Sequence, residues 1–403
     1  MREVTQPVKA RGTMRSAVAV VAALAALLAF APFASATSDP LASGTTSITL
    51  NKGLFKKLKK NGVKVLKVSP GTVKKRTVKL PVSGGSLDPT TGAGTVEHNG
   101  GIKFKRGKRT AAVNTLVLET ASASLKAKVA GKNMKLASVK GVTLTRNGFG
   151  ANVSISSLKL TSKAAKRLNK KLGFTGKKKN KNGKKVAVKP LLKGNQTLGS
   201  SASETQPKTL AVLPSGNATL TTSLPTVAKL AKVKVGIELI PPASLVSAGP
   251  PPAFAFPIGG GTIAPDANNG IVQTTGGLKL HQVFVPGEVE TTMTLGAIWI
   301  DLGAKTATVE VTVESKGIDP KLSLGPLGRS SIADVSLAGA TVKSDSTART
   351  VTVENASASL QAVTAETLNS VFVKPFEGVT KTEAEKFAAG DPLGTFSLTA
   401  QTQ

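Results

Sequence analysis

Apolar and polar residues alternate along much of the chain. The segments VSISSLKL (Val153 to Leu160), ATVEVTVES (Ala307 to Ser315) and RTVTVENASASL (Arg349 to Leu360) carry branched or apolar residues at every second position. This period is that of a β-strand with one buried face. Turn residues interrupt the pattern about every eight to twelve residues, which is typical of a sandwich or a barrel. The pattern therefore predicts a mainly β fold.

The same pattern occurs twice. LPVSGGSLDPTTGAGTVEHNGGIKF (Leu80 to Phe104) aligns with FPIGGGTIAPDANNGIVQTTGGLKL (Phe256 to Leu280). Many of the identities are glycines, and these imply shared backbone turns more than shared chemistry. Two further pairs of segments extend the match and indicate short helices. One pair is TLNKGLFKKLKKNGVKV (49–65) and TLTTSLPTVAKLAKVKV (219–235), and the other is SKAAKRLN (162–169) and TAETLN (364–369). In the second copy Ser223 is the expected N-cap, with Pro225 just inside the helix.

We therefore expect two tandem β-sandwich-like domains, each with about two short helices. The first would span residues 45–206 and the second residues 210–403. A Pro-rich insert over residues 240–254, IPPASLVSAGPPPAF, interrupts the second domain and should be extended.

The N-terminal segment reads as a secretory signal peptide over residues 1–36. A basic residue precedes an apolar run from Ala17 to Phe30, and Ala34-Ser35-Ala36 is a small-residue cleavage motif. Met14 is an alternative start, and an uncleaved membrane anchor is the rival interpretation. No later stretch reaches the ~18 apolar residues of a spanning helix, so we expect no transmembrane segment after cleavage and a secreted, cell-envelope location.

The inventory of reactive residues is small. The chain has no Cys, no Tyr and two His, which excludes disulfides, thiolate metal sites and cysteine nucleophiles. It lacks the G-x-S-x-G motif of a nucleophile elbow, and the first repeat has too few carboxylates for paired acid–base chemistry. We expect neither an enzyme nor a metal site.

Three motifs carry a resemblance to a known family. A helix of the form F-[RK]-x-x lies near the start, a glycine-bounded strand holds His98-Asn99-Gly100, and an A-x-x-LN helix precedes G-x-x-LG. In this combination the chain resembles the haem-transport-associated (HtaA) domain of proteins secreted by Gram-positive bacteria. The resemblance implies β-rich domains that bind haem at the cell surface through a helix tyrosine in a pattern close to S-F-R-x-Y.

The resemblance gives candidate haem-binding residues, and the chain departs from the family at the ligand. Phe55 matches the family phenylalanine, and Leu58 stands at the tyrosine position, with Ala228 as its counterpart in the repeat. His98 matches the family histidine, whereas the second copy has Thr274. His98 is thus either an iron ligand or partner, or a polar strand residue retained as a vestige. Met293 is either an axial thioether or core filler.

Charge divides the two copies. Net charge is +32, yet residues 37–206 contribute +31 (36 Lys+Arg against 5 Asp+Glu) and residues 207–403 contribute −2 (14 against 16). A field of this kind attracts polyanions. The candidate polymer-binding lysines lie in the first helix and in a basic loop: Lys56, Lys57, Lys59, Lys60, Lys177, Lys178, Lys179, Lys184 and Lys185.

The partners that fit this charge are anionic wall polymers or lipid headgroups. Nucleic acid is not expected, because aromatic residues for base stacking are scarce. The sequence thus predicts a secreted, non-catalytic HtaA-domain envelope protein of the haem-binding class, with haem as a candidate cofactor. The alternative is a structural or adhesive envelope protein that binds anionic wall polymers through its basic first domain.

Overall fold

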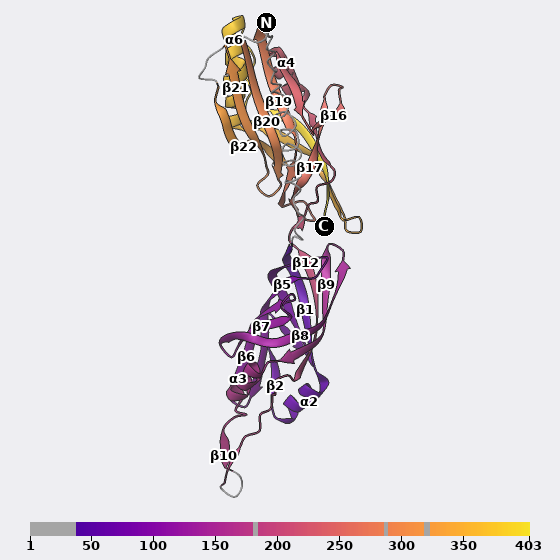
Figure 1. The fold of residues 1–403 in the computed structure, drawn as a ribbon, viewed down its shortest axis with the longest axis vertical. Coiled ribbons are helices and arrows are strands. Elements are labelled where there is room, and N and C mark those ends of the chain that lie inside the picture. Colours follow the sequence, from indigo (N-terminus) through magenta and orange to yellow (C-terminus); the bar gives the residue numbers. More distant parts are fainter. Residues whose placement is uncertain (1–37, 180–183, 286–288, 318–322) are drawn as a thin grey trace, which may run out of the picture. The chain divides into compact units, whose positions relative to one another are not determined.

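The computed structural model describes residues 38–179, 184–285, 289–317 and 323–403. The predicted signal peptide over residues 1–36, with its alternative start at Met14, lies outside these residues. Within them the chain forms two large antiparallel sheets, one with strands between Asp39 and Pro207 and one with strands between Leu210 and Gln401 (Figure 1). We call the two parts the first and the second domain. No helix within the described ranges is long and apolar enough to cross a membrane.

The first sheet closes on itself. Eight strands pair in the order β5-β6-β7-β8-β9-β12-β1-β4, and β4 pairs again with β5. The ring consists of β1 (Asp39–Leu50), β4 (Thr77–Leu87), β5 (Gly94–Arg106), β6 (Arg109–Glu119), β7 (Ser124–Val129), β8 (Lys132–Asn147), β9 (Gly150–Leu160) and β12 (Thr197–Pro207). Two short strands extend it, β2 (Lys64–Val68) on β5 and β3 (Thr72–Lys74) on β4.

The second sheet repeats this ring. Its order is β17-β14-β25-β24-β22-β21-β20-β18, with β18 returning to β17. The strands are β14 (Asn217–Thr222), β17 (Ala253–Ile263), β18 (Gly270–Thr274), β20 (Val289–Asp301), β21 (Thr306–Lys316), β22 (Gly325–Ser336), β24 (Thr350–Leu360) and β25 (Pro392–Gln401). The flanking strands are β13 (Leu210–Ala211), β15 (Val235–Ile240), β16 (Ser244–Ser247), β19 (Gly277–Val285) and β23 (Thr341–Asp345).

The mainly β, tandem fold predicted from the sequence is confirmed, and each predicted sandwich is a closed, barrel-like sheet. The shared glycines serve the shared backbone. Gly100 and Gly276 have φ of +84° and +78°, and in each a Cβ would lie 2.6 Å from a backbone nitrogen, that of Gly71 or that of Ala243. Within the Pro-rich insert, β16 is extended and pairs with β17.

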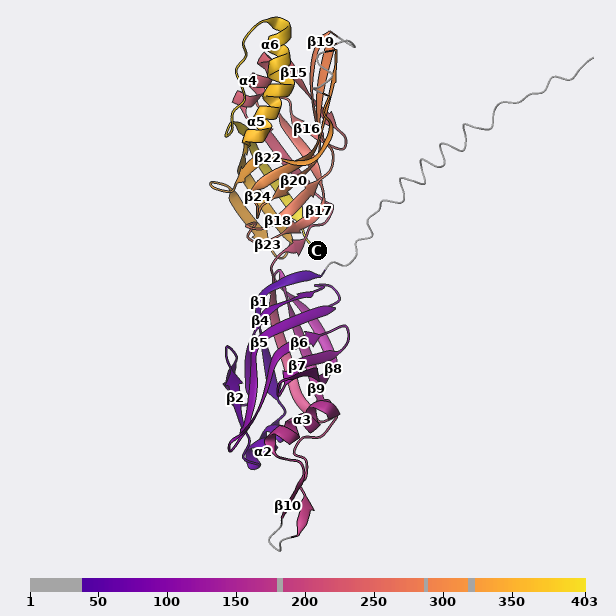
Figure 2. The same ribbon diagram turned by 90° about the vertical axis from the view of Figure 1, so that its left-hand side faces the viewer.

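Helices gather at one end of each sheet (Figure 2). The first domain has α2 (Lys52–Lys60) and α3 (Ser162–Leu172). The second has α4 (Leu224–Lys232) and a longer segment, α5 (Ala362–Leu368), which continues through a π-helical turn η2 (Asn369–Val373) into α6 (Lys374–Thr380). Ser223 caps α4 with Pro225 just inside it, as predicted.

An asparagine, buried in the first domain and half-buried in the second, fixes the second helix of each domain. The Asn169 side chain donates to the carbonyl of Leu192 (2.8 Å) and accepts from its N–H (3.0 Å). Asn369 forms the same pair of bonds with Phe387, both at 2.8 Å. The matched asparagines place α3 and α5 in register, so that position 164 corresponds to 364 and position 167 to 367.

Candidate binding cavity and basic surface

His98 lies inside the first domain. Its side chain is 4% exposed, with Nδ1 3.0 Å from the Leu116 carbonyl oxygen and Nε2 2.6 Å from the Thr46 hydroxyl. The Thr46 hydroxyl is also 2.8 Å from Ser203 Oγ. Since a carbonyl only accepts, Nδ1 carries the proton of the neutral ring. Burial lowers the pKa of His98 below its ordinary value, and the bond to the Leu116 carbonyl opposes this shift. Burial therefore favours the neutral ring, whose Nδ1 donates to the Leu116 carbonyl, while the Thr46 hydroxyl beside Nε2 donates to Ser203 Oγ.

Thr274 occupies the same place in the second domain. His98 pairs with Val82 across β4 and β5, and Thr274 pairs with Ile258 across β17 and β18. Thr274 donates to the carbonyl of Ile298 (2.8 Å), much as His98 donates to that of Leu116. The shared requirement is a buried donor for a strand carbonyl, and this explains why the histidine of the first copy can be a threonine in the second.

The other members of the polar network are apolar in the second domain. Thr46 pairs with Ser203 across β1 and β12, whereas Ala218 pairs with Leu398 across β14 and β25 at the matching positions. The interior of the second domain is consequently less polar than that of the first.

The two helix candidates for haem binding belong to the hydrophobic core. Leu58 is 1% exposed, and Phe55 is half-buried against the same cluster of side chains. The N-caps Asn51 and Ser223 align Leu58 with Leu230 and Leu54 with Thr226. The alignment that placed Ala228 opposite Leu58 is therefore two residues out of register.

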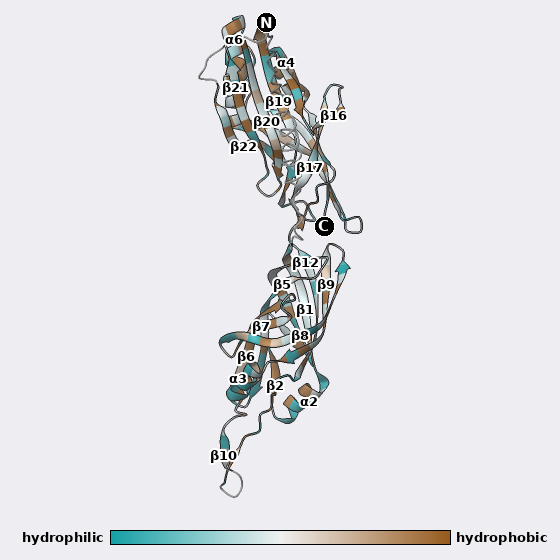
Figure 3. Ribbon diagram, in the orientation of Figure 1, coloured by the Kyte–Doolittle hydropathy of each residue, from teal (hydrophilic) through white to brown (hydrophobic). Residues whose placement is uncertain are grey.

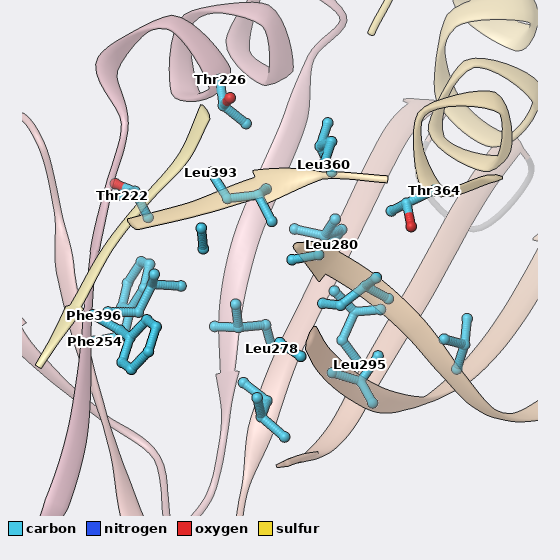
Figure 4. Close-up of a pocket in the computed structure, with 18 of the residues that line it drawn as sticks. Thr222, Thr226, Phe254, Leu278, Leu280, Leu295, Leu360, Thr364, Leu393 and Phe396 are labelled. Atoms are coloured by element: carbon cyan, nitrogen blue, oxygen red, sulfur yellow. The ribbon is translucent and has the colours of Figure 1, made fainter. Parts of the chain in front are cut away.

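A large apolar cavity lies inside the second domain. Its volume is about 250 Å³, and Figure 4 shows leucine and phenylalanine side chains converging on it from several strands. Sheet residues such as Phe254, Leu278, Leu295 and Phe396 form its wall, and helices α4 and α5 line one side. Met293, a sequence candidate for a thioether ligand, also lines the wall and is 3% exposed. His98 is not among the lining residues.

The difference between α3 and α5 at two matching positions explains why the second domain has this cavity. In the first domain Ala164 is fully buried, and Arg167 ties α3 to the barrel by donating to the carbonyls of Val129 (2.7 Å) and Ala130 (2.8 Å). The corresponding residues of α5 are Thr364 and Thr367, and both line the cavity. The Thr367 hydroxyl donates instead to the carbonyl of Val363 on its own helix (2.8 Å), so this side chain does not bond α5 to the sheet.

Helix α4 is anchored at the cavity by polar contacts that leave no charge inside it. Thr226 donates to the carbonyl of Pro392 (2.6 Å), and Ser223 donates to the same oxygen. The Lys229 ammonium lies 2.8 Å from the Asp391 carboxylate, and this bond raises the pKa of Lys229. Neither Lys229 nor Asp391 lines the cavity.

The cavity was missed in the sequence, although one signal pointed to it. Helix α3 has Lys163 where α5 has Val363, which is 71% exposed. An exposed valine where the repeat has a lysine indicates an apolar feature beside it. Among the described residues no group of three or more His, Cys, Asp or Glu could hold a metal ion.

The second candidate site is the charged surface of the first domain. Strands β1, β5, β7 and β9 end at the helices, and β4, β6, β8 and β12 begin there. The turns at this end are basic, and we call the surface the basic pole: Lys56, Lys59 and Lys60 on α2; Lys74, Lys75 and Arg76; Arg106, Lys108 and Arg109; Lys128 and Lys132; Lys163, Lys166, Lys170 and Lys171 on α3.

The carboxylates lie in the other half of the domain. Asp39 begins β1, Asp88 follows β4, Glu119 ends β6, and Glu97 and Glu204 lie toward the same ends of β5 and β12. A few cations share this half. Lys126 lies 2.5 Å from Glu119, and bonds from Lys126 and Ser122 lower the pKa of Glu119 to about 2.

Three of the predicted polymer-binding lysines belong to the basic pole. Lys56, Lys59 and Lys60 are exposed, but Lys57 is half-buried and donates to the Leu191 carbonyl (2.5 Å). The others lie in or directly beside a ribbon of two strands, β10 (Lys177–Lys179) and β11 (Lys185–Ala187). The ribbon extends from the same end of the domain (Figures 1 and 2) and is hydrophilic in Figure 3. Lys177 and Lys184 are exposed, whereas the side chains of Lys178, Lys179 and Lys185 lie outside the described part.

Comparison with known proteins returns a similarity of fold. No protein-family model and no curated protein matches the chain. Among solved structures it is similar to the C-terminal domain of HtaA from Corynebacterium glutamicum, at 14% identity over 48% of this chain and 99% of that domain, with a TM-score of 0.33. It is also similar to the N-terminal domain of the same protein, at 17% identity over 47% and 99%, again with a TM-score of 0.33. These domains are from the family that the sequence resembles, and likeness at this level says nothing about ligands.

Proposed function

We propose that the chain is a secreted, non-catalytic envelope protein of two HtaA-like domains, which the first domain holds on anionic polymers of the cell envelope. The observation that supports this function is the separation of charge within the first domain. Exposed lysines from α2 and α3, and from three strand turns, gather at the basic pole, while the domain's carboxylates lie in the opposite half.

The separation of lysines from carboxylates matters because it leaves a positive electrostatic potential at one end of the first domain. Exposed charges of mixed sign cancel within a Debye length of about 8 Å at physiological salt, whereas a surface of one sign attracts a polyanion over that distance. The pole is mostly lysine, whose ammonium is a point charge without fixed bidentate geometry. Such a surface suits a repeating polyanion of variable conformation, with phosphate or carboxylate groups along its length.

The test is the binding of the purified mature protein to immobilised polyphosphate and to isolated cell-wall fragments. The variant Lys56→Gln/Lys59→Gln/Lys60→Gln removes three exposed charges of the pole, and Lys305→Gln/Lys374→Gln/Lys386→Gln removes three exposed charges of the second domain. At about 0.5 kcal/mol for each exposed charge pair, the pole variant should bind about tenfold more weakly. Equal weakening in both variants would contradict a role for the pole.

Haem binding is the second candidate function, and it is supported by the resemblance of His98-Asn99-Gly100 to the family motif. The test is a titration of the mature protein with haem, followed by absorbance, beside His98→Ala. Because Nδ1 of His98 donates to the Leu116 carbonyl and the ring is 4% exposed, ligation of iron there would require the ring to leave its buried position. We expect identical spectra for the two proteins. A saturable Soret shift that the variant loses would assign the iron to His98.

A further inference from the structure

We infer that the cavity of the second domain binds a small, uncharged, hydrocarbon-rich molecule that carries at most a hydroxyl-type polar group. This inference concerns a different domain from the basic pole and does not depend on the proposed attachment. Three features of the cavity support it: its volume, its opening and its lack of charge.

The volume is large for a protein interior. Side chains in a core are packed as densely as organic crystals and leave few voids larger than a water molecule. A cavity of about 250 Å³ exceeds the ~150 Å³ void that accommodates benzene in an engineered protein, and by that scale it holds about ten carbon atoms. A tetrapyrrole ring is several times larger. An alcohol with a medium-length chain, or one end of an isoprenoid, matches the space.

The cavity has an apolar opening. Val363 on α5 and Leu327 on β22 line it and are 71% and 44% exposed. Exposed valine and leucine side chains beside an apolar interior form a continuous path for an apolar ligand to enter. On this side of α5 the Thr367 hydroxyl bonds within its own helix, whereas Arg167 at the matching position of α3 bonds to its sheet.

The polar groups of the wall are serine and threonine hydroxyls. Thr226 and Thr274 each donate to a backbone carbonyl, so their protons are already used. Ser331 also lines the cavity, and its buried Oγ has no hydrogen-bond partner among the described residues. A buried hydroxyl without a partner is costly, but this oxygen is shielded from the cavity space as well as from solvent, so it does not select a polar ligand.

The absence of charge in the wall selects against anions. The cavity is lined by aliphatic, aromatic, Ser, Thr and Met side chains. A carboxylate or phosphate placed there would lose its hydration without gaining a counter-ion, because the nearby Lys229 is already paired with Asp391. Fatty acids, phospholipid headgroups and the propionates of haem are therefore disfavoured relative to a neutral alcohol of the same size.

The experiment uses the purified mature protein with 1-naphthylamine, a neutral dye small enough for the cavity, whose fluorescence at short wavelength increases in apolar surroundings. We expect a saturable rise in fluorescence, and we expect decanol to displace the dye at a concentration at least about tenfold lower than decanoate. Thr364→Trp, which fills the cavity from α5, should weaken dye binding by about tenfold or more while the protein stays folded by circular dichroism. Non-saturable fluorescence, or displacement by decanoate or haem as readily as by decanol, would overturn the inference.

A charge at the opening provides a test that does not disturb the core. Val363→Arg changes a largely exposed residue and should improve decanoate binding relative to decanol by several-fold. Val342→Arg places the same charge on β23, on a residue that does not line the cavity, and should leave the ratio unchanged. The same ratio in both variants would show that the dye binds elsewhere, which also overturns the inference.

Discussion

At the scale of single residues, His98 and Thr274 show how one structural need is met by two side chains. Each lies inside a closed sheet and donates to a strand carbonyl, that of Leu116 or that of Ile298. The imidazole reaches further than the threonine hydroxyl, and its second nitrogen continues the network to Thr46. The alternation around GTVEHNGG predicts a strand here, but it does not reveal the partners, because they come from β1 and β6.

The buried imidazole should make the first domain sensitive to acid. Burial lowers the folded-state pKa of His98 below 6.5, its value in an unfolded chain, so the unfolded state binds more protons just below that pH. Stability must then fall as the pH drops below about 6.5. In His98→Gln the side chain stays neutral, and the part of the pH dependence that His98 supplies should disappear.

The measurement is urea unfolding at pH 5 and pH 7, with and without the substitution. Circular dichroism reports both domains, whereas fluorescence of Trp299, the single tryptophan, reports the second domain. The difference between wild type and variant should appear in circular dichroism alone. If both proteins lost the same stability between the two pH values, His98 would not be the group that titrates.

At the scale of elements, the sequence predicts the short helices but not how tightly they pack. The repeated LN motif and the cap at Ser223 indicate where helices begin and end. Whether a cavity opens beneath a helix depends on the summed volumes of side chains from strands far apart in the chain. The exchange of Arg167 for Thr367 changes that sum and removes two bonds to the sheet, and no local pattern records this effect.

The asparagines that fix these helices should contribute more to the free energy of unfolding than ordinary surface residues do. Asn169→Ala would leave the buried N–H and carbonyl of Leu192 without partners, at a cost of about 2–4 kcal/mol in unfolding free energy. Asn369→Ala should destabilise the second domain by a similar amount through Phe387, and Trp299 fluorescence would follow it. Asn133→Ala, on an exposed strand position, is the control and should stay within about 0.5 kcal/mol of wild type.

At the scale of the molecule, the sequence shows how much charge the first domain carries, and the strand order shows at which end of the domain that charge lies. Counting residues shows an excess of lysine in the first domain. It does not show that the turns at Lys75 and Lys108 lie at one end, because that depends on how hairpins alternate around a closed sheet. A count of lysines also includes side chains that are not free to bind a polymer. Lys57 belongs to the predicted cluster, but its ammonium donates to the Leu191 carbonyl.

The salt dependence of binding distinguishes a local surface from the net charge of the whole chain. Each ion pair formed with a linear polyanion releases a condensed counter-ion, so the slope of log K against log salt counts the contacts, at about 0.7–0.9 for each cation on a nucleic acid. If the basic pole makes the contacts, replacing Lys56, Lys59 and Lys60 by Gln should lower the slope on polyphosphate by roughly two units. Replacing Lys305, Lys374 and Lys386 should leave it unchanged, although the net charge falls equally. A slope that fell by the same amount in both variants would mean that the polymer senses total charge, and the separation of charge within the first domain would then have no part in attachment.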